Sequence, residues 1–207
     1  MEIARILELI RSKIPPHVSL IAVSKTVSIS DIQAAYDAGQ RDFGESRVQE
    51  ALPKIEVLPK DITWHFIGKL QSNKVKQVAE HFQVIHTLES ESQLRELAKI
   101  DHDMDCLIEV NIAEEPQKSG ILPESLDRFI QSVIECKHVR LKGLMTVGPA
   151  HRNAEDMRPY FNRLREMSRK LGEDAWLSMG MSNDFEVAIQ EGSTHIRVGS
   201  AIFGART

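Results

Sequence analysis

The feature that most constrains the fold of this chain is a regular alternation between two kinds of segment. Short apolar runs rich in Val, Ile and Leu alternate with longer segments whose apolar residues recur at helical spacing. No linker or low-complexity stretch interrupts this order. Eight strands are predicted, at Leu20–Ser24, Arg41–Phe43, Trp64–Ile67, Val84–His86, Cys106–Ile112, Arg140–Met145, Trp176–Met179 and Thr194–Val198.

Strand followed by helix, repeated eight times, indicates a parallel α/β fold. Eight such units close into a (β/α)8 barrel, for which a chain of 207 residues is compact. The length predicts a single domain over residues 1–207. The alternative is a doubly wound open sheet, because the number of strands inferred from a sequence can be wrong by one or two.

Charge and composition exclude several classes of partner. The net charge of −4 gives no basic excess for binding nucleic acid. No apolar run reaches the length needed to span a membrane, and charged residues inside the apolar stripe of residues 1–16 predict an amphipathic helix there, not a signal peptide. The two cysteines, Cys106 and Cys136, have neither metal-ligand nor redox spacing, which predicts a cytoplasmic protein.

A parallel barrel carries its functional groups at the C-terminal ends of its strands. The first predicted strand is nearly apolar, and Lys25 follows it at once. In a largely apolar barrel, burial lowers the pKa of a lysine and frees its amine to attack an aldehyde. The alternatives are that Lys25 reaches solvent from the strand end, or that it pairs with a carboxylate in a purely structural barrel.

The ends of the last two strands predict an anion site. Barrels often bind phosphate through the loops after strands seven and eight, using backbone N–H groups. "GMSND" supplies Ser182, and "VGSAIFG" supplies Gly199 and Ser200 before a short final helix. Each segment alone is also an ordinary helix start. Arg197, inside the eighth strand, either pairs with a carboxylate in the barrel or presents its charge to a ligand.

An amine and a phosphate site at one barrel mouth suit a phosphorylated aldehyde, and pyridoxal 5′-phosphate (PLP) is the obvious one. A cofactor-free enzyme with a Schiff-base lysine, such as an aldolase, is an alternative. "GQRDFGES" has the glycine spacing of a P-loop, but Glu45 stands where the lysine is required, which argues against nucleotide binding. The basic segment "GKLQSNKVK" is interpreted as the solvated face of a helix.

Several strings of this sequence together resemble the pyridoxal phosphate homeostasis protein family. They are "AVSKT", "AGQRDFGESRVQEA", "WHFIGKLQSNK", "VNIAEEPQKSG", "LKGLMT" and "LSMGMSNDFEVAIQEGSTHIRVGSAIFGAR", and the last is very specific. The resemblance runs from about Leu20 to Arg206. It implies a fold type III PLP-binding barrel, related to the N-terminal barrel of alanine racemase.

The resemblance also implies roles for individual residues. Lys25 in "VSKT" matches the lysine that forms a Schiff base with PLP. Ser182, Gly199 and Ser200 match the positions that bind the phosphate group of PLP. Arg197 matches the arginine that faces the pyridine nitrogen.

Four further positions carry weaker implications. His65 in "WHFIG" and Met179 in "SMGMS" match residues that line the cofactor pocket. Ser46 departs from the family, which often has Asn in "GEN", so a side-chain contact from this position stays open. Lys118 in "QKSG" matches a basic position near the barrel mouth, and a direct role toward the cofactor stays open as well.

The expected function is binding without catalysis. An arginine at the pyridine nitrogen keeps the ring neutral and weakens it as an electron sink. The resemblance adds that alanine racemase takes a second base, a tyrosine, from a separate C-terminal domain of its partner subunit. This sequence ends at Thr207, and its two tyrosines, Tyr36 and Tyr160, fall on predicted outer helices.

We therefore expect a monomeric carrier or buffer that balances PLP, a vitamin B6 form, and passes it to PLP-dependent apoenzymes. The alternative is a PLP-dependent amino-acid racemase or lyase.

Overall fold

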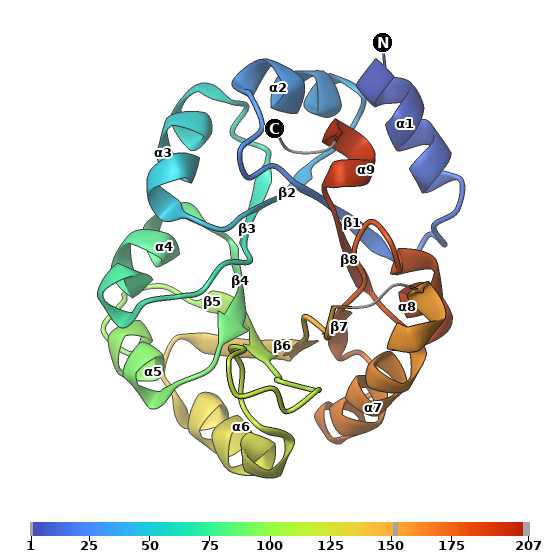
Figure 1. The fold of residues 1–207 in the computed structure, drawn as a ribbon. Coiled ribbons are helices and arrows are strands. Elements are labelled where there is room, and N and C mark those ends of the chain that lie inside the picture. The colour runs from blue at the N-terminus through green and yellow to red at the C-terminus, as the bar shows by residue number, and fades with distance from the viewer. Residues whose placement is uncertain (1, 151–152, 205–207) are drawn as a thin grey trace.

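The computed structural model describes residues 2–150 and 153–204, and within them eight parallel strands form a closed barrel in chain order. Helices surround the barrel on the outside (Figure 1). This confirms the predicted (β/α)8 barrel. The strands are β1 Ser19–Val23, β2 Asp42–Glu45, β3 Thr63–Phe66, β4 Val84–Leu88, β5 Met104–Glu109, β6 Val139–Met145, β7 Trp176–Ser178 and β8 His195–Val198.

Closure of the barrel rests on the pairing of the first strand with the last. Partners run from Ser19 with His195 to Ala22 with Val198. An open sheet would leave these two edges unpaired, so the doubly wound alternative is wrong.

The described helices form the outer layer, and short sequence signals explain where several begin. Ser28 caps α2 by accepting the N–H of Asp31, and Ser90 forms a capping box with Gln93 at α5. A 3₁₀ turn at Ala154–Met157 comes directly before α7, and Pro159 lies in the first turn of that helix. The helices are α1 Glu2–Arg11, α2 Ile29–Asp37, α3 Val48–Val57, α4 Val75–His81, α5 Glu91–Leu97, α6 Leu126–Glu135, α7 Arg158–Ser168, α8 Phe185–Gln190 and α9 Ser200–Phe203.

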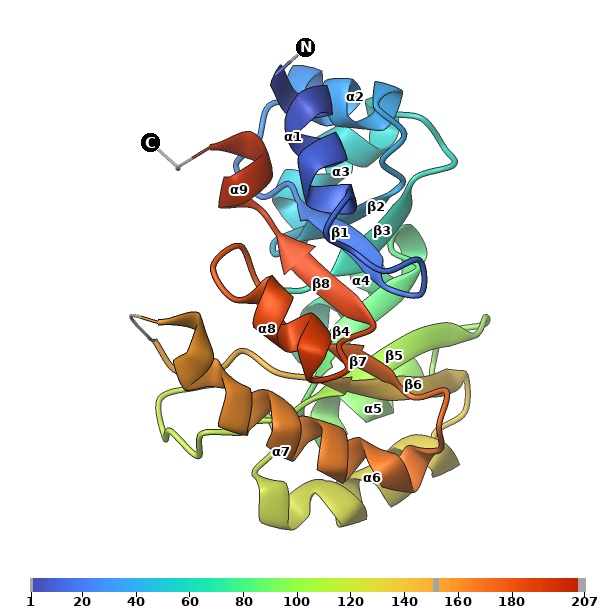
Figure 2. The same ribbon diagram turned by 90° about the vertical axis from the view of Figure 1, so that its right-hand side faces the viewer.

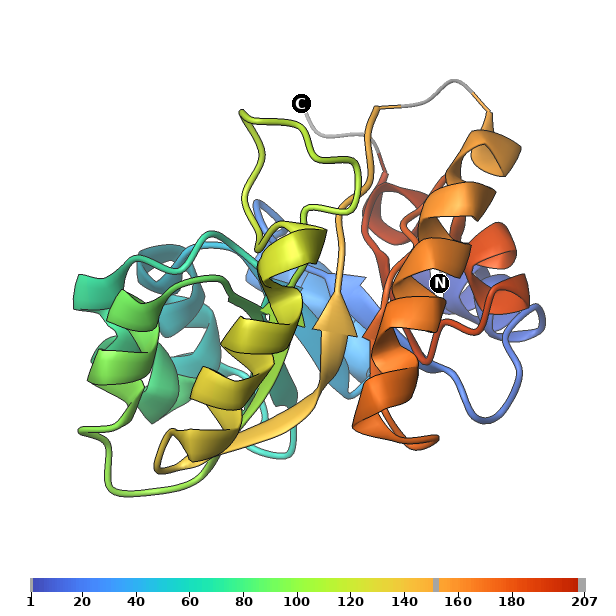
Figure 3. The same ribbon diagram turned by 90° about the horizontal axis from the view of Figure 1, so that it is seen from below.

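The observed strand ends agree with the predicted ones to within a few residues, and β5 differs most. The apolar run was predicted to stay in the barrel as far as Ile112, whereas β5 ends at Glu109. Val110 then forms an isolated bridge with Ile121, on the returning arm of the loop. Figure 3 shows this light-green loop standing above the C-terminal ends of the strands.

The barrel interior is more polar than the sequence suggested. His86 Nδ1 on β4 lies 2.9 Å from Ser178 Oγ on β7. Because β4 and β7 are not neighbours, these side chains can meet only across the interior. His65 and Arg197 are joined to the same group, and Arg197 is 4% exposed. The expectation of a largely apolar interior is therefore wrong.

The two ends of the described chain lie close together on one side of the barrel. Helices α1 and α9 are side by side, next to β1 and β8, in two perpendicular views (Figures 1 and 2). Of the helices in the described part of the chain, none has the length and apolar character that would let it cross a membrane. Arg206 and Thr207, where the resemblance and the sequence end, lie outside the described residues.

Candidate functional site

A cavity of about 320 Å³ lies at the C-terminal ends of β1, β7 and β8. Five of the predicted site residues line it, namely Lys25, Ser182, Arg197, Gly199 and Ser200. An adjoining hollow of about 270 Å³ shares Lys25, Gly199 and Ser200 with it. The volume lies in the range of small-molecule sites, so the structure brings the predicted amine and the predicted anion site to one ligand-sized space.

Lys25 lies in the turn after β1, separated from the strand by Ser24, and is half-buried at the cavity wall. The residues on either side of it are bonded to the neighbouring helix α3. Lys54 Nζ donates to the carbonyl oxygen of Ser24 at 2.8 Å, and the N–H of Thr26 donates to the carboxylate of Glu50. Thr26 has a φ of 65°, in the left-handed region. These contacts fix the turn that carries Lys25.

A buried ion pair between Lys54 and Glu45 lies against the turn that carries Lys25. Lys54 Nζ lies 2.8 Å from Glu45 Oε1 and 3.0 Å from Glu50 Oε1. Lys54 is 6% exposed and Glu45 is 0% exposed. Burial raises the pKa of Glu45, while the bonds from Lys54 and from the Ser24 hydroxyl oppose that shift. This cluster was not predicted, although Glu50 and Lys54 have the helical i, i+4 spacing that could have indicated it.

The loops after β7 and β8 meet at the hydroxyl group of Ser182. Ser182 Oγ accepts the backbone N–H groups of Gly199 and Ala201, each at 3.3 Å. The loop can take this path because Gly180 has a φ of +92° and a Cβ there would come within 2.5 Å of Ala188 Cβ. A hydroxyl group and two N–H groups gathered in one place are donors that suit phosphate oxygens.

Arg197 is held rigidly at the wall of the cavity. Its NH1 donates to Ser178 Oγ at 2.6 Å, and its NH2 donates to the carbonyl oxygen of Thr146 at 2.8 Å. Burial lowers the pKa of Arg197 to about 10, against the opposing charges of Glu109 and Asp184. The guanidinium therefore stays charged at neutral pH. Both of these bonds end on neutral oxygens, which leaves the positive charge of Arg197 available to the cavity.

Two of the predicted site residues do not line this cavity. His65 lies inside the barrel, where its ring nitrogens are 2.9 Å from Asp42 Oδ1 and 3.0 Å from His86 Nε2. Met179 is fully buried in the apolar core, and Met181 lines the cavity instead. A direct contact of His65 or Met179 with a ligand stays a prediction.

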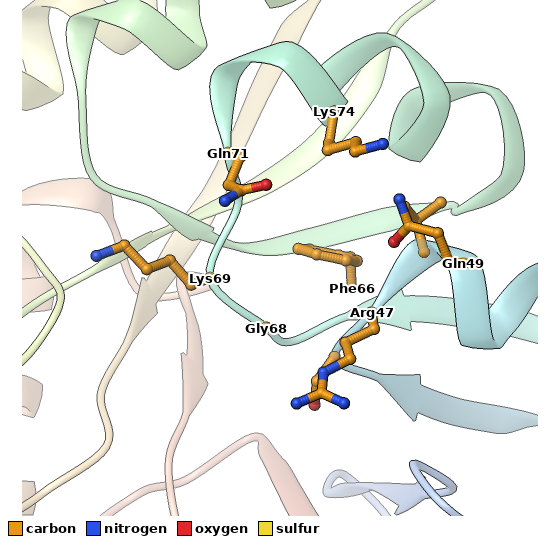
Figure 4. Close-up of a pocket in the computed structure, with 9 residues that line it drawn as sticks. Arg47, Gln49, Phe66, Gly68, Lys69, Gln71 and Lys74 are labelled. Carbon is orange, nitrogen blue, oxygen red and sulfur yellow. The ribbon is translucent and has the colours of Figure 1, made fainter.

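Ser46 belongs to a different hollow, of about 420 Å³, beside the ends of β2 and β3. Arg47, Lys69 and Lys74 also line it. Figure 4 shows these three cations spread around Phe66, with the ammonium group of Lys69 directed away from that of Lys74. The basic segment was interpreted as a solvated helix face, but Lys69 and Lys74 lie before α4 and line this hollow.

Lys118 lies in the loop after β5 and does not line the cavity of Lys25. Its ammonium group is bonded to Glu115 Oε1 at 3.0 Å and to the carbonyl oxygen of Gly148 at 2.9 Å. In this arrangement Lys118 ties two loops of the barrel mouth together.

Glu109, at the end of β5, is a functional candidate that the sequence analysis did not single out. Burial, together with the charge of Glu89, raises the pKa of Glu109 to about 7, and Arg197 and Lys69 oppose the shift. The signal available in the sequence was a carboxylate at the C-terminal end of an apolar strand. Within the described residues, no group of three or more His, Cys, Asp or Glu side chains could hold a metal ion.

Both tyrosines lie on outer helices, as predicted. Tyr36 is on α2, where its hydroxyl donates to Asp61 Oδ1 at 2.7 Å, and Tyr160 is on α7. Neither lines the cavity that contains Lys25.

Known proteins with similar sequences or structures include pyridoxal phosphate homeostasis proteins and alanine racemases. Residues 2–207 match the family model for the alanine racemase N-terminal domain. The pyridoxal phosphate homeostasis protein of Aquifex aeolicus is 43% identical, over 90% of this chain and 86% of its own length. The structure of PipY from Synechococcus elongatus PCC7942 with PLP bound has a TM-score of 0.86 and 38% identity, covering 98% of this chain and 100% of PipY. Alanine racemase from Corynebacterium glutamicum shares the fold alone, with a TM-score of 0.76 and 16% identity over 99% of this chain and 61% of that chain.

Proposed function

The chain belongs to the pyridoxal phosphate homeostasis protein family, and on this premise we propose that it binds PLP covalently and keeps it in reserve. One observation carries the proposal. A single cavity joins the amine of Lys25, the donors gathered at Ser182 and the buried cation of Arg197. The PLP-bound structure of a protein 38% identical supports the choice of ligand.

The residues of the cavity fit the chemical groups of PLP. The cofactor supplies an aldehyde that condenses with a primary amine, with loss of one water, to give a Schiff base. Lys25 is the lysine that lines the cavity, and its backbone is held on both sides by α3. Ser182 and Ser200 would donate their hydroxyl groups to the phosphate oxygens, and the N–H of Gly199 would exchange its bond to Ser182 Oγ for one to the phosphate.

Arg197 would face the ring nitrogen and keep it without a proton. A guanidinium with a pKa of about 10 is a donor and cannot accept the proton that a carboxylate would share with the ring. The ring then withdraws electrons less strongly, which favours storage over turnover.

Release requires only that water or another amine displaces Lys25. We propose that the recipients are PLP-dependent apoenzymes and that the protein acts as a monomer.

The alternative function, an amino-acid racemase or lyase, needs a second proton carrier at the cavity. Asp184 lines it, but this carboxylate is buried and Oδ1 already accepts the N–H of Met181 at 2.6 Å.

The test is a visible spectrum of the protein with added PLP, before and after borohydride reduction, followed by peptide mapping. We expect a yellow protein and a reduced adduct on Lys25, with loss of the absorbance in Lys25→Ala. Lys74→Ala is the matched control, because Lys74 lines the other hollow. A colourless protein, or an adduct on another lysine, would contradict the proposal, and alanine racemisation at ordinary enzymatic rates would favour the alternative.

A further inference from the structure

A chain of side chains runs through the barrel interior from one end to the other. Arg197 NH1 lies 2.6 Å from Ser178 Oγ, and Ser178 Oγ lies 2.9 Å from His86 Nδ1. His86 Nε2 lies 3.0 Å from His65 Nδ1, and His65 Nε2 lies 2.9 Å from Asp42 Oδ1. Each link therefore has the length of a hydrogen bond.

The two ends of this chain are chemically opposite. Arg197 lines the ligand cavity and can only donate. Asp42 is the first residue of β2, at the other end of the barrel, and its side chain is 37% exposed. As a carboxylate it can only accept.

These ends fix the direction of every link between them. Asp42 requires a proton on His65 Nε2, so a neutral His65 accepts at Nδ1. His86 must then carry its proton on Nε2 and accept at Nδ1. Ser178 donates to that nitrogen while it accepts from Arg197. A neutral imidazole has one donor and one acceptor nitrogen, so this pattern uses each of them once.

Burial supports a neutral state for the central histidine. His86 is fully buried, and burial lowers the pKa of His86 well below its usual range, reinforced by the charges of His65, Arg197 and His195. A proton added to His65 would force its Nδ1 to donate, which would move the proton of His86 to Nδ1. Ser178 Oγ would then face two donors, from His86 and Arg197.

We propose that Asp42, His65, His86 and Ser178 are positioning residues that hold Arg197 against the ligand cavity through one hydrogen-bonded chain of fixed direction. The geometry assigns the proton of both histidines to Nε2. The carboxylate of Asp42, at the far end of the barrel, thus determines the orientation of the Arg197 guanidinium at the mouth. The part that concerns PLP rests on the proposed function.

The first test needs no cofactor. Long-range ¹H–¹⁵N NMR correlations of the histidine rings in the free protein at pH 7–8 report which nitrogen carries the proton. We expect the Nε2–H form for both His65 and His86. Asp42→Ala should leave His65 without one dominant form, whereas Asp42→Asn keeps an acceptor oxygen and should preserve it.

Asp105→Ala is the matched control. Asp105 also lies near the start of a strand, but it bonds to Arg140 and takes no part in the hydrogen-bonded series from Asp42 to Arg197. A wild-type His86 with its proton on Nδ1 would overturn the inference. So would a His65 signal that is identical in wild type and in folded Asp42→Ala.

The second test measures the consequence for the ligand. Ser178→Ala removes the link to Arg197 and should raise the PLP dissociation constant roughly threefold to tenfold, as expected for loss of one typical intramolecular hydrogen bond. The visible band of bound PLP should shift in Ser178→Ala and in Asp42→Ala, but not in Asp105→Ala.

The two tests separate the two claims. If wild type binds no PLP, the proposed function fails, but the NMR result still shows whether the hydrogen bonds from Asp42 to Ser178 have the proposed direction. If PLP binds and neither variant changes the band, the positioning role is refuted.

Discussion

Replacing Lys54 by methionine tests how far the structure around Lys25 depends on one buried charge. The ammonium group of Lys54 makes three bonds, to the carbonyl oxygen of Ser24, to Glu45 and to Glu50. Methionine fills a similar volume but makes none of them. Glu45, which is fully buried, then keeps the hydrogen bond from the Ser24 hydroxyl, at 2.7 Å from Oε1, but loses its bond from Lys54.

Loss of one partner of a buried ion pair typically costs about 3–5 kcal/mol in the free energy of unfolding, because the other charge stays buried. For a chain of this size the loss corresponds to a decrease of roughly 6–20 °C in Tm. The loss depends on pH with a definite sign. Burial already raises the pKa of Glu45, and removing Lys54 raises it further. A carboxyl whose pKa is raised in the folded state destabilises the fold as pH rises, so the deficit of Lys54→Met should grow from pH 5 to pH 8.

The assay is urea denaturation of wild type, Lys54→Met and Lys54→Met/Glu45→Gln at several pH values. The second substitution removes the stranded charge, so the double variant should recover much of the lost free energy and most of the pH dependence. Retention of PLP should also decrease in Lys54→Met, since the turn before Lys25 loses its anchor. A deficit below about 1 kcal/mol at pH 8, or one that does not change with pH, would refute the role given to the pair.

Three further predictions follow from single residues. The pKa of Glu109 is about 7 in the folded chain against 4.5 for its usual value, so the free energy of unfolding should fall between these pH values. This fall is on the order of 3 kcal/mol, and it should disappear from a pH series of urea melts on Glu109→Gln. Gly180→Ala should lower the free energy of unfolding by about 2 kcal/mol or more, because alanine resists a φ of +92° and its Cβ meets Ala188; an unchanged thermal melt would contradict this. Lys69→Ala should leave the PLP dissociation constant within about twofold of wild type in a spectroscopic titration, since its hollow is separate and the charge is screened.

Sequence patterns predicted the strands and the mouth of the barrel because both depend on local order. A parallel barrel strand is buried on both faces and appears as a short apolar run, which located β1 to within one residue at either end. Lys25 and Gly199 directly follow predicted strands and Ser182 lies in the loop after one, so the fold rule alone brought them to one end.

The rest required contacts between residues that are distant in the sequence. His86 and Ser178 are 92 positions apart, and nothing local indicates that they bond across the interior. Lys54 reaches back from α3 to Ser24, 30 positions earlier. The end of β5 was misplaced because Val110 and Ile112 continue the apolar run after the chain has left the barrel.

The polar residues of the barrel interior and the ligand cavity are connected through one requirement, namely that the buried charge of Arg197 has polar partners. A guanidinium group that is 4% exposed is tolerated only if its donors are satisfied and its charge is balanced. Ser178 and Thr146 satisfy two donors of Arg197, and Glu109 and Asp184 contribute opposing charge. An apolar interior could not provide these partners. His65 and His86 therefore stand where barrels commonly place Val, Ile or Leu because they continue, through Ser178, the hydrogen-bonded series that holds this cation at the mouth.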